Sequence, residues 1–164
     1  MKLTPLYKGL ITGVILVALT LVFYYSNVPS NSSLQYALYI VYAAGIAWTL
    51  IAYARSQNYT GKFGDIFGQG FRCFIIISLV MTVFGGVFTA VHPEFAEHDA
   101  KLYREYLDKE EKDKTPAEKD EIVTNYKKYY TFSVVQKSIY GSLIPGVLFT
   151  LAGAGLLILK KKNP

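Results

Sequence analysis

Hydrophobic and polar positions follow one another along this chain in long blocks. Four blocks contain no charged residue and no histidine, and they cover residues 9–25, 34–53, 73–91 and 138–159. A helix rises about 1.5 Å per residue, so blocks of this length match the apolar thickness of a bilayer, about 30 Å. The pattern therefore predicts four membrane-spanning helices.

The first block has a second interpretation, a cleaved secretory signal peptide, because Lys2 and Lys8 precede it. A cleavage site needs small residues after the apolar stretch. The block instead ends in the bulky pair Tyr24 and Tyr25. We therefore interpret residues 9–25 as an uncleaved span.

The connections between the blocks differ in polarity. Residues 26–33 are uncharged and rich in turn-forming residues, which predicts a short turn. In the connection from residue 54 to residue 72, four aromatic or aliphatic residues recur at helical spacing: Phe63, Ile66, Phe67 and Phe71. A short apolar face between polar neighbours predicts an interfacial segment over residues 62–71 that lies on the bilayer surface.

Residues 92–132 form the polar part of the chain, with 11 of its 12 acidic residues and eight basic ones. Pro93 suits a helix start, and Thr115 with Glu118 has the pattern of a capping box. Each predicted helix carries an apolar stripe, formed by Phe95, Leu102, Tyr103, Tyr106 and Leu107 in the first and by Ile122, Val123, Tyr126, Tyr129 and Tyr130 in the second. We expect a helical hairpin over residues 93–132 whose stripes are buried against each other and against the membrane rim. The second hairpin helix is expected to continue into the last span.

These elements predict an all-α fold, an integral membrane four-helix bundle with an extramembrane helical hairpin between spans three and four. The whole chain, residues 1–164, is expected to form a single membrane domain. Composition agrees, since hydrophobic residues make up 52% and mean hydropathy is +0.26. Charged residues make up 18%, against about 25% in soluble domains.

The net charge of +5 is explained by basic residues that flank the apolar blocks. Such residues contact anionic lipid headgroups and set the orientation of the spans. The N-terminal segment, the connection 54–72 and the lysines 160–162 carry them, whereas residues 26–33 carry none. We therefore expect both termini in the cytoplasm. No basic face interleaves with aromatic residues, so nucleic acid is not an expected partner.

Candidate chemistry is sparse. His92, Glu94, Glu97 and His98 crowd the start of the hairpin, and Glu94 and His98 share a helix face as metal ligands do. An acidic residue that favours the positive helix end explains the same pattern. Residues 64–72 resemble a glycine-rich phosphate loop but lack its Lys-Ser/Thr ending, and we interpret them as a membrane-surface turn. We predict no catalytic, cofactor-binding or metal-binding residue.

The single cysteine and the glycines also have two interpretations each. Cys73 follows Arg72 at the expected bilayer edge, so it is a candidate for lipidation, although a plain buried thiol is the simpler interpretation. Gly9 and Gly13, and a second group in the last span (Gly141, Gly146, Ala152, Gly153, Ala154 and Gly155), let helices approach closely. We expect them to serve packing within the chain before dimerisation.

Pumps and secondary transporters use ionisable residues within their spans, and the four blocks have none. We therefore expect a non-enzymatic interaction or structural component, which contacts a membrane protein partner or a second copy of itself through the hairpin. The alternative is a subunit of an oligomeric channel or small-solute transporter, with the stripe Tyr36, Tyr39 and Tyr42 lining a pore rather than anchoring an interface. An intramembrane enzyme would have to use His92 or Asp65, and we expect no enzymatic activity.

Several short motifs point to a family. On these motifs the chain resembles a family of small four-span bacterial inner-membrane proteins, a domain of unknown function. The resemblance covers most of the chain and implies a bacterial plasma membrane, but it implies no activity, cofactor or site residue. The motifs are Tyr53-Ala54-Arg55 at the end of span two, Phe63-Gly64 to Gly70-Phe71-Arg72 before span three, and His92-Pro93-Glu94-Phe95 after it.

Overall fold

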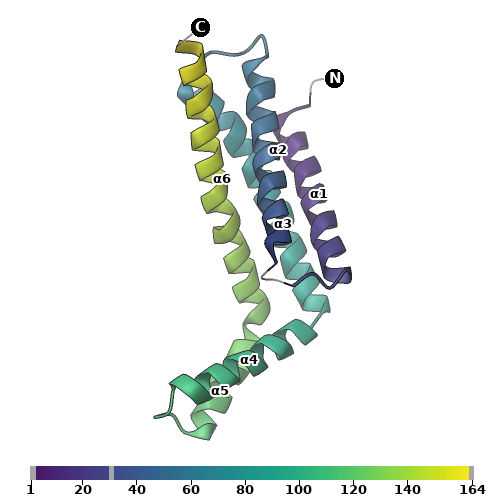
Figure 1. The fold of residues 1–164 in the computed structure, drawn as a ribbon, viewed down its shortest axis with the longest axis vertical. Coiled ribbons are helices and arrows are strands. Elements are labelled where there is room, and N and C mark those ends of the chain that lie inside the picture. The colour runs from purple at the N-terminus through teal and green to yellow at the C-terminus, as the bar shows by residue number, and fades with distance from the viewer. Residues whose placement is uncertain (1–2, 30–31, 163–164) are drawn as a thin grey trace. The chain divides into compact units, whose positions relative to one another are not determined.

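The computed structural model describes residues 3–29 and 32–162, and in these ranges the protein is all-α. The predicted fold class is confirmed, with a polar helix pair between the third and fourth long apolar helices (Figure 1). The elements in chain order are α1 (Pro5–Tyr25), the short 3₁₀ helix η1 (Ser33–Gln35), α2 (Tyr36–Ala54), α3 (Phe63–Val91), α4 (Glu94–Glu110), α5 (Pro116–Lys128) and α6 (Tyr130–Lys162).

Four helical segments are long and apolar enough to cross a membrane: Pro5–Tyr25, Ser33–Ala54, Phe63–Val91 and Tyr130–Leu159. Their most apolar windows have mean hydropathies of 1.7 to 2.4, yet at most 28% of each window is buried inside the protein. An apolar helix that turns most of its surface outward is suited to lipid rather than to water. The protein is therefore a multi-pass membrane protein.

The third span begins earlier than the sequence pattern suggested. We expected an interfacial segment over residues 62–71 and a span from Cys73, but α3 is one helix that runs from Phe63 to Val91. The reason is a buried stripe that continues past the exposed Arg72 without a change of period, formed by Ile66, Gly70, Cys73, Phe74 and Ile77. A charged residue on the opposite face does not end a helix, so the predicted helix boundary at residue 72 is corrected, while the position at which the chain enters the membrane stays a prediction.

The last span also begins earlier, at Tyr130 instead of residue 138. The second hairpin helix and this span are two helices rather than one, which corrects the expected continuity. The helix α5 ends at Lys128, and Tyr129 caps it with φ −102° and ψ 11°, outside the helical values. A backbone change at this one residue separates the two helices.

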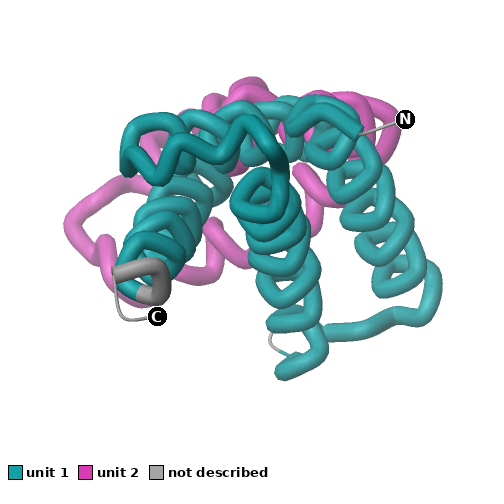
Figure 2. The backbone as a smooth tube through the Cα atoms, turned by 90° about the horizontal axis from the view of Figure 1, so that it is seen from above, with its two compact units in different colours: residues 1–81, 139–164 teal, residues 82–138 magenta. Residues whose placement is uncertain are grey.

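The chain forms two compact units, which Figure 2 shows in different colours. Unit 1 contains residues 1–81 and 139–164, and unit 2 contains residues 82–138. Within unit 1, the start of α1, the α2–α3 connection and the end of α6 lie at the same end (Figure 1). This arrangement collects the basic segments of the chain at one end of the unit.

The core of unit 1 is built by close contact between helices. It consists of Leu16, Tyr42, Ile46, Leu50, Ile66, Cys73, Phe74, Ile77 and Ala154. A Cβ added at Gly9 would lie 2.5 Å from the carbonyl oxygen of Cys73, and one at Gly146 would lie 2.7 Å from the ring of Phe74. The expected role of small residues in internal packing is confirmed at these positions, whereas Gly141 and Gly155 face open space.

Candidate functional site

The histidines and acids at the start of the hairpin are paired locally. His92 Nδ1 lies 2.6 Å from Glu94 Oε1, and His98 Nδ1 lies 3.5 Å from Asp99 Oδ1. A hydrogen bond from the Glu94 backbone N–H to the Glu94 carboxylate, followed by the contact with His92, holds the pKa of this carboxyl below its usual range. Glu94 and His98 therefore contact different neighbours, and in the part of the chain that the structure describes no three potential metal ligands cluster.

The glycine-rich segment at residues 64–72 is helical, as the first part of α3. It is therefore neither a phosphate loop nor the turn that we expected. Asp65 accepts a hydrogen bond from Thr60 Oγ1 at 2.6 Å, which joins the preceding connection to the helix start. Asp65 is thus engaged at a helix N-terminus, where an acidic residue is stabilising.

Cys73 and Tyr42 are both buried in unit 1. The Cys73 thiol is fully enclosed, with Sγ 3.8 Å from the Gly45 carbonyl oxygen, so the interpretation as a buried thiol is confirmed. The Tyr42 hydroxyl donates to the Ser142 carbonyl at 2.9 Å. Tyr36 and Tyr39 are more than half exposed, so the three tyrosines do not share one environment as a pore-lining stripe requires.

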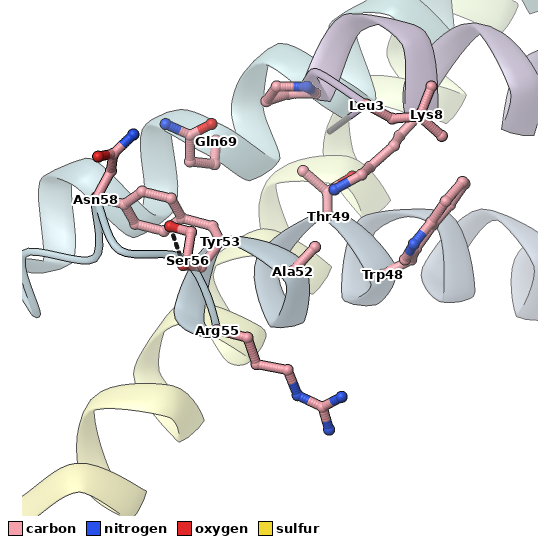
Figure 3. A pocket seen from close by; sticks show the side chains of 11 residues that line it. Leu3, Lys8, Trp48, Thr49, Ala52, Tyr53, Arg55, Ser56, Asn58 and Gln69 are labelled. Carbon is pink, nitrogen blue, oxygen red and sulfur yellow. Dashed lines mark hydrogen bonds between the residues drawn. The ribbon is translucent and has the colours of Figure 1, made fainter. Parts of the chain in front are cut away.

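A cleft of about 420 Å³ opens at the basic end of unit 1 (Figure 3). Its walls come from α1, α2, the α2–α3 connection and α3. Its basic, aromatic and amide side chains are Lys8, Trp48, Tyr53, Arg55, Asn58 and Gln69. Tyr and Trp concentrate at the level of lipid headgroups in membrane proteins, so these residues indicate that the cleft lies at that level.

Lys8 is the unexpected member of this cleft. Sequence analysis treated it as a flanking residue, but it lies in the second turn of α1 with only 7% of its surface exposed. Its Nζ lies 5.5 Å from the centre of the Trp48 ring. A cation over an aromatic face gains about 1 kcal/mol, so the Trp48 ring stabilises the Lys8 ammonium less than an ion pair in a desolvated site would.

The two charged residues that line the cleft, Lys8 and Arg55, are both basic. Arg55 is exposed at the rim, and its guanidinium points away from Lys8 in Figure 3. The described lining residues include no Asp or Glu. Lys8 forms no ion pair with any carboxylate of the described residues, whereas Lys119 and Arg104 in unit 2 both do. The cleft therefore offers positive charge that no acidic side chain among the described residues neutralises.

The hairpin of α4 and α5 is held together by tyrosines and ion pairs. The rings of Tyr103 and Tyr126 lie 4.9 Å apart, and Tyr130 Oη donates to Asp99 at 3.0 Å. Burial, and then the nearby Asp99 carboxylate, raise the pKa of Tyr126 above its ordinary value. The predicted contact between the two stripes is confirmed for these tyrosines.

Charged side chains join the same two helices along a second line. Lys119 is 8% exposed, and its Nζ lies 3.1 Å from Asp108 Oδ1. Arg104 contacts Asp108 on its own helix and Asp120 on α5. The hydrogen bond from Lys119 is the main cause of a lowered pKa of Asp108. The charges of this face are thus matched within the hairpin.

Part of the predicted apolar stripe remains uncovered within unit 2. Leu102 is 53% exposed and Tyr106 56% exposed. Tyr129, which follows α5, is 55% exposed. The buried face of α4 runs instead through Ala100 and Leu107. The α4 helix therefore has two apolar faces and α5 covers one of them, while burial of the remaining stripe residues against the membrane rim stays a prediction.

The fold and these surfaces define the class: a multi-pass α-helical membrane protein with a polar helical hairpin between its third and fourth spans. Residues 7–161 match the family described as "Protein of unknown function (DUF4199)", and the chain belongs to this family. No curated protein and no solved structure matches the chain. The family membership confirms the coarse resemblance seen in the sequence.

Proposed function

We propose that this chain is a non-enzymatic interaction or structural component of a bacterial inner membrane, whose hairpin contacts a protein partner. The observation that supports the proposal is the exposed apolar stripe of Leu102 and Tyr106 on α4. The hairpin is already joined by its tyrosines and ion pairs, so this stripe is not needed to hold it together. An apolar stripe that internal packing leaves free is typical of an interaction surface.

Charge favours protein over lipid as the occupant of this stripe. Residues 92–132 carry eight basic and 11 acidic residues, a net charge of −3. An acidic segment is repelled by anionic headgroups. A partner with an apolar patch and a basic rim fits this surface, and a second copy of the same acidic hairpin fits it less well.

The proposed orientation places both termini in the cytoplasm and the hairpin on the opposite side. Arg55, Lys62 and Arg72 belong to the α2–α3 connection and the start of α3, at the end of unit 1 where α1 begins and α6 ends (Figure 1). Basic residues beside spans favour the cytoplasmic side. Three spans precede the hairpin, so it emerges on the other side of the membrane.

The test is site-specific photo-crosslinking in intact cells. A photoreactive phenylalanine analogue replaces Tyr106 on the exposed stripe, and in a matched variant it replaces Lys101 on the charged side of α4. We expect Tyr106 to give an adduct with one protein of discrete mass and Lys101 to give none. Addition of Leu102→Ser is expected to remove the adduct.

Three outcomes would contradict the proposal. Adducts of equal yield from both positions would mean unspecific contact, and lipid adducts alone would mean that the stripe faces the bilayer. A product at twice the chain mass of 18.4 kDa would replace the partner with a second copy.

A further inference from the structure

We infer that the cleft around Lys8 binds the phosphate group of an anionic membrane lipid. Three observations carry this inference: Lys8 is only 7% exposed and has no anionic partner among the described residues, Arg55 lies at the rim, and the described lining residues include no Asp or Glu. The cleft lies entirely within unit 1. The inference therefore depends on the four spans but not on the role proposed for the hairpin.

The lining chemistry suits a phosphate. Lys8 supplies a point charge inside the cleft, and Arg55 at the rim supplies a planar donor group on a long side chain. Asn58 and Gln69 add amide donors from the α2–α3 connection and from α3. Lys and Arg are the common ligands of phosphate in proteins, and charge-assisted hydrogen bonds are about twice as strong as neutral ones.

The surroundings favour a lipid as the source of this phosphate. Two apolar side chains of the cleft lining are themselves exposed, Leu3 at 39% and Trp48 at 42%. These side chains give acyl chains an apolar surface next to the headgroup site. A zwitterionic lipid carries a cation beside its phosphate, and that cation would be repelled by Lys8 and Arg55. The cleft therefore favours an anionic headgroup.

Trp48 makes the inference measurable, because it is the only tryptophan of the chain and lies in the cleft. The full chain is placed in vesicles of phosphatidylcholine with increasing amounts of brominated phosphatidylglycerol, which quenches tryptophan on contact. Brominated phosphatidylcholine measures unselective contact. We expect phosphatidylglycerol to be enriched about fivefold at Trp48, as one cation near a membrane surface contributes about 1 kcal/mol.

Four variants distinguish a specific site from a general effect of positive charge. Lys8→Gln is expected to reduce the phosphatidylglycerol enrichment to about one. The control is Lys62→Gln, which is expected to keep the enrichment, because Lys62 is an exposed lysine of the α2–α3 connection that does not line the cleft. Lys8→Arg should restore most of it. Arg55→Gln, which changes an exposed residue and leaves the packing intact, should lower it in part. Equal size-exclusion profiles in detergent show that each variant is folded.

A second arm distinguishes the source of the phosphate. Inorganic phosphate is added to the protein in phosphatidylcholine vesicles, and Trp48 emission is followed. If Trp48 emission changes in a Lys8-dependent way but phosphatidylglycerol is not enriched, the cleft binds phosphate and the proposal that a lipid supplies it is refuted. No enrichment and no response to phosphate would overturn the inference, as would enrichment that survives Lys8→Gln.

Discussion

The two compact units of this protein are packed by different means. Unit 1 buries apolar side chains and glycines that bring helix backbones into contact, as at Gly9 against the Cys73 carbonyl. Unit 2 joins α4 to α5 through tyrosine contacts and ion pairs, including the buried Lys119 with Asp108. Unit 1 contains the greater part of each of the four candidate spans, and unit 2 contains the polar segment.

The difference follows from the solvent of each unit. Lipid is as apolar as the side chains of a span, so helices in a membrane gain little from burial and depend on close fit. In water the hydrophobic effect and charge pairing both contribute. The stability of unit 1 should therefore depend on added side-chain volume and not on pH. The stability of unit 2 should depend on pH and tolerate added volume.

The largest effect is expected for Gly146→Ala. The new Cβ would lie 2.5 Å from the Tyr42 hydroxyl oxygen and 2.7 Å from the ring of Phe74, which is fully buried. Overpacking of this kind costs about 1–3 kcal/mol. Thermal unfolding in detergent should show a clear loss of stability. Gly141→Ala in the same helix meets nothing within 4 Å and should be neutral or stabilising; equal losses would refute close fit as the cause.

A smaller loss is expected for Tyr42→Phe, which removes the hydroxyl that donates to the Ser142 carbonyl. A hydrogen bond of this kind contributes about 1 kcal/mol. Tyr39→Phe on the same helix is the control, because Tyr39 is 52% exposed. The same thermal unfolding assay checks both variants, and unchanged stability in Tyr42→Phe would mean that the bond contributes nothing.

The sequence predicts some of these features and not others, for physical reasons. Charge-free blocks define the spans because an unpaired charge in lipid is costly. The capping box of Thr115 and Glu118 is equally local, and both of its hydrogen bonds are present. The burial of Lys8 depends on Trp48, 40 residues further along the chain, so no local pattern reveals it.

The starts of α3 and α6 were misplaced for the same reason, because they too depend on contacts that a local sequence pattern does not show. The position of Arg72 suggested an interface, but α3 continues through it because its opposite face is buried, with Gly70 close to Leu50 of α2 and Thr150 of α6. Likewise, the apolar positions of α4 divide into a face covered by α5 and a face with Leu102 and Tyr106. Periodicity shows that both faces exist, and only packing shows which one is covered.

In unit 2, Thr115→Ala should weaken α5 and leave unit 1 unchanged. The Thr115 hydroxyl accepts from the Glu118 N–H, and loss of such a cap costs about 1 kcal/mol. Amide hydrogen exchange should quicken in residues 116–128 and stay constant in α2. The control is Thr124→Ala, whose hydroxyl only bonds back to the Asp120 carbonyl. Equal acceleration in both variants would contradict a specific role of the cap.

The smallest effect concerns pH. The hydrogen bond from Lys119 lowers the pKa of Asp108, and hydrogen bonds from the Thr115 backbone and side chain lower that of Glu118. A carboxyl whose pKa is lower in the folded state stabilises above its ordinary pKa, and this contribution is lost as pH falls through the folded value. The rate of amide hydrogen exchange in α5, corrected for the pH dependence of the intrinsic exchange rate, should therefore increase below about pH 4. Equal quickening in α2, which has no acidic residue, would contradict a local origin.

The proposed topology, with the basic cleft at the cytoplasmic face and the acidic hairpin on the outer side of the membrane, is tested most directly by cysteine labelling. Single cysteines replace Lys62 or Lys112 in a Cys73→Ala background, and intact cells are treated with a membrane-impermeant thiol reagent. We expect the cysteine at position 112 to be labelled and the one at position 62 to be labelled only after the cells are opened. Labelling of position 62 alone in intact cells would invert the topology and contradict the account.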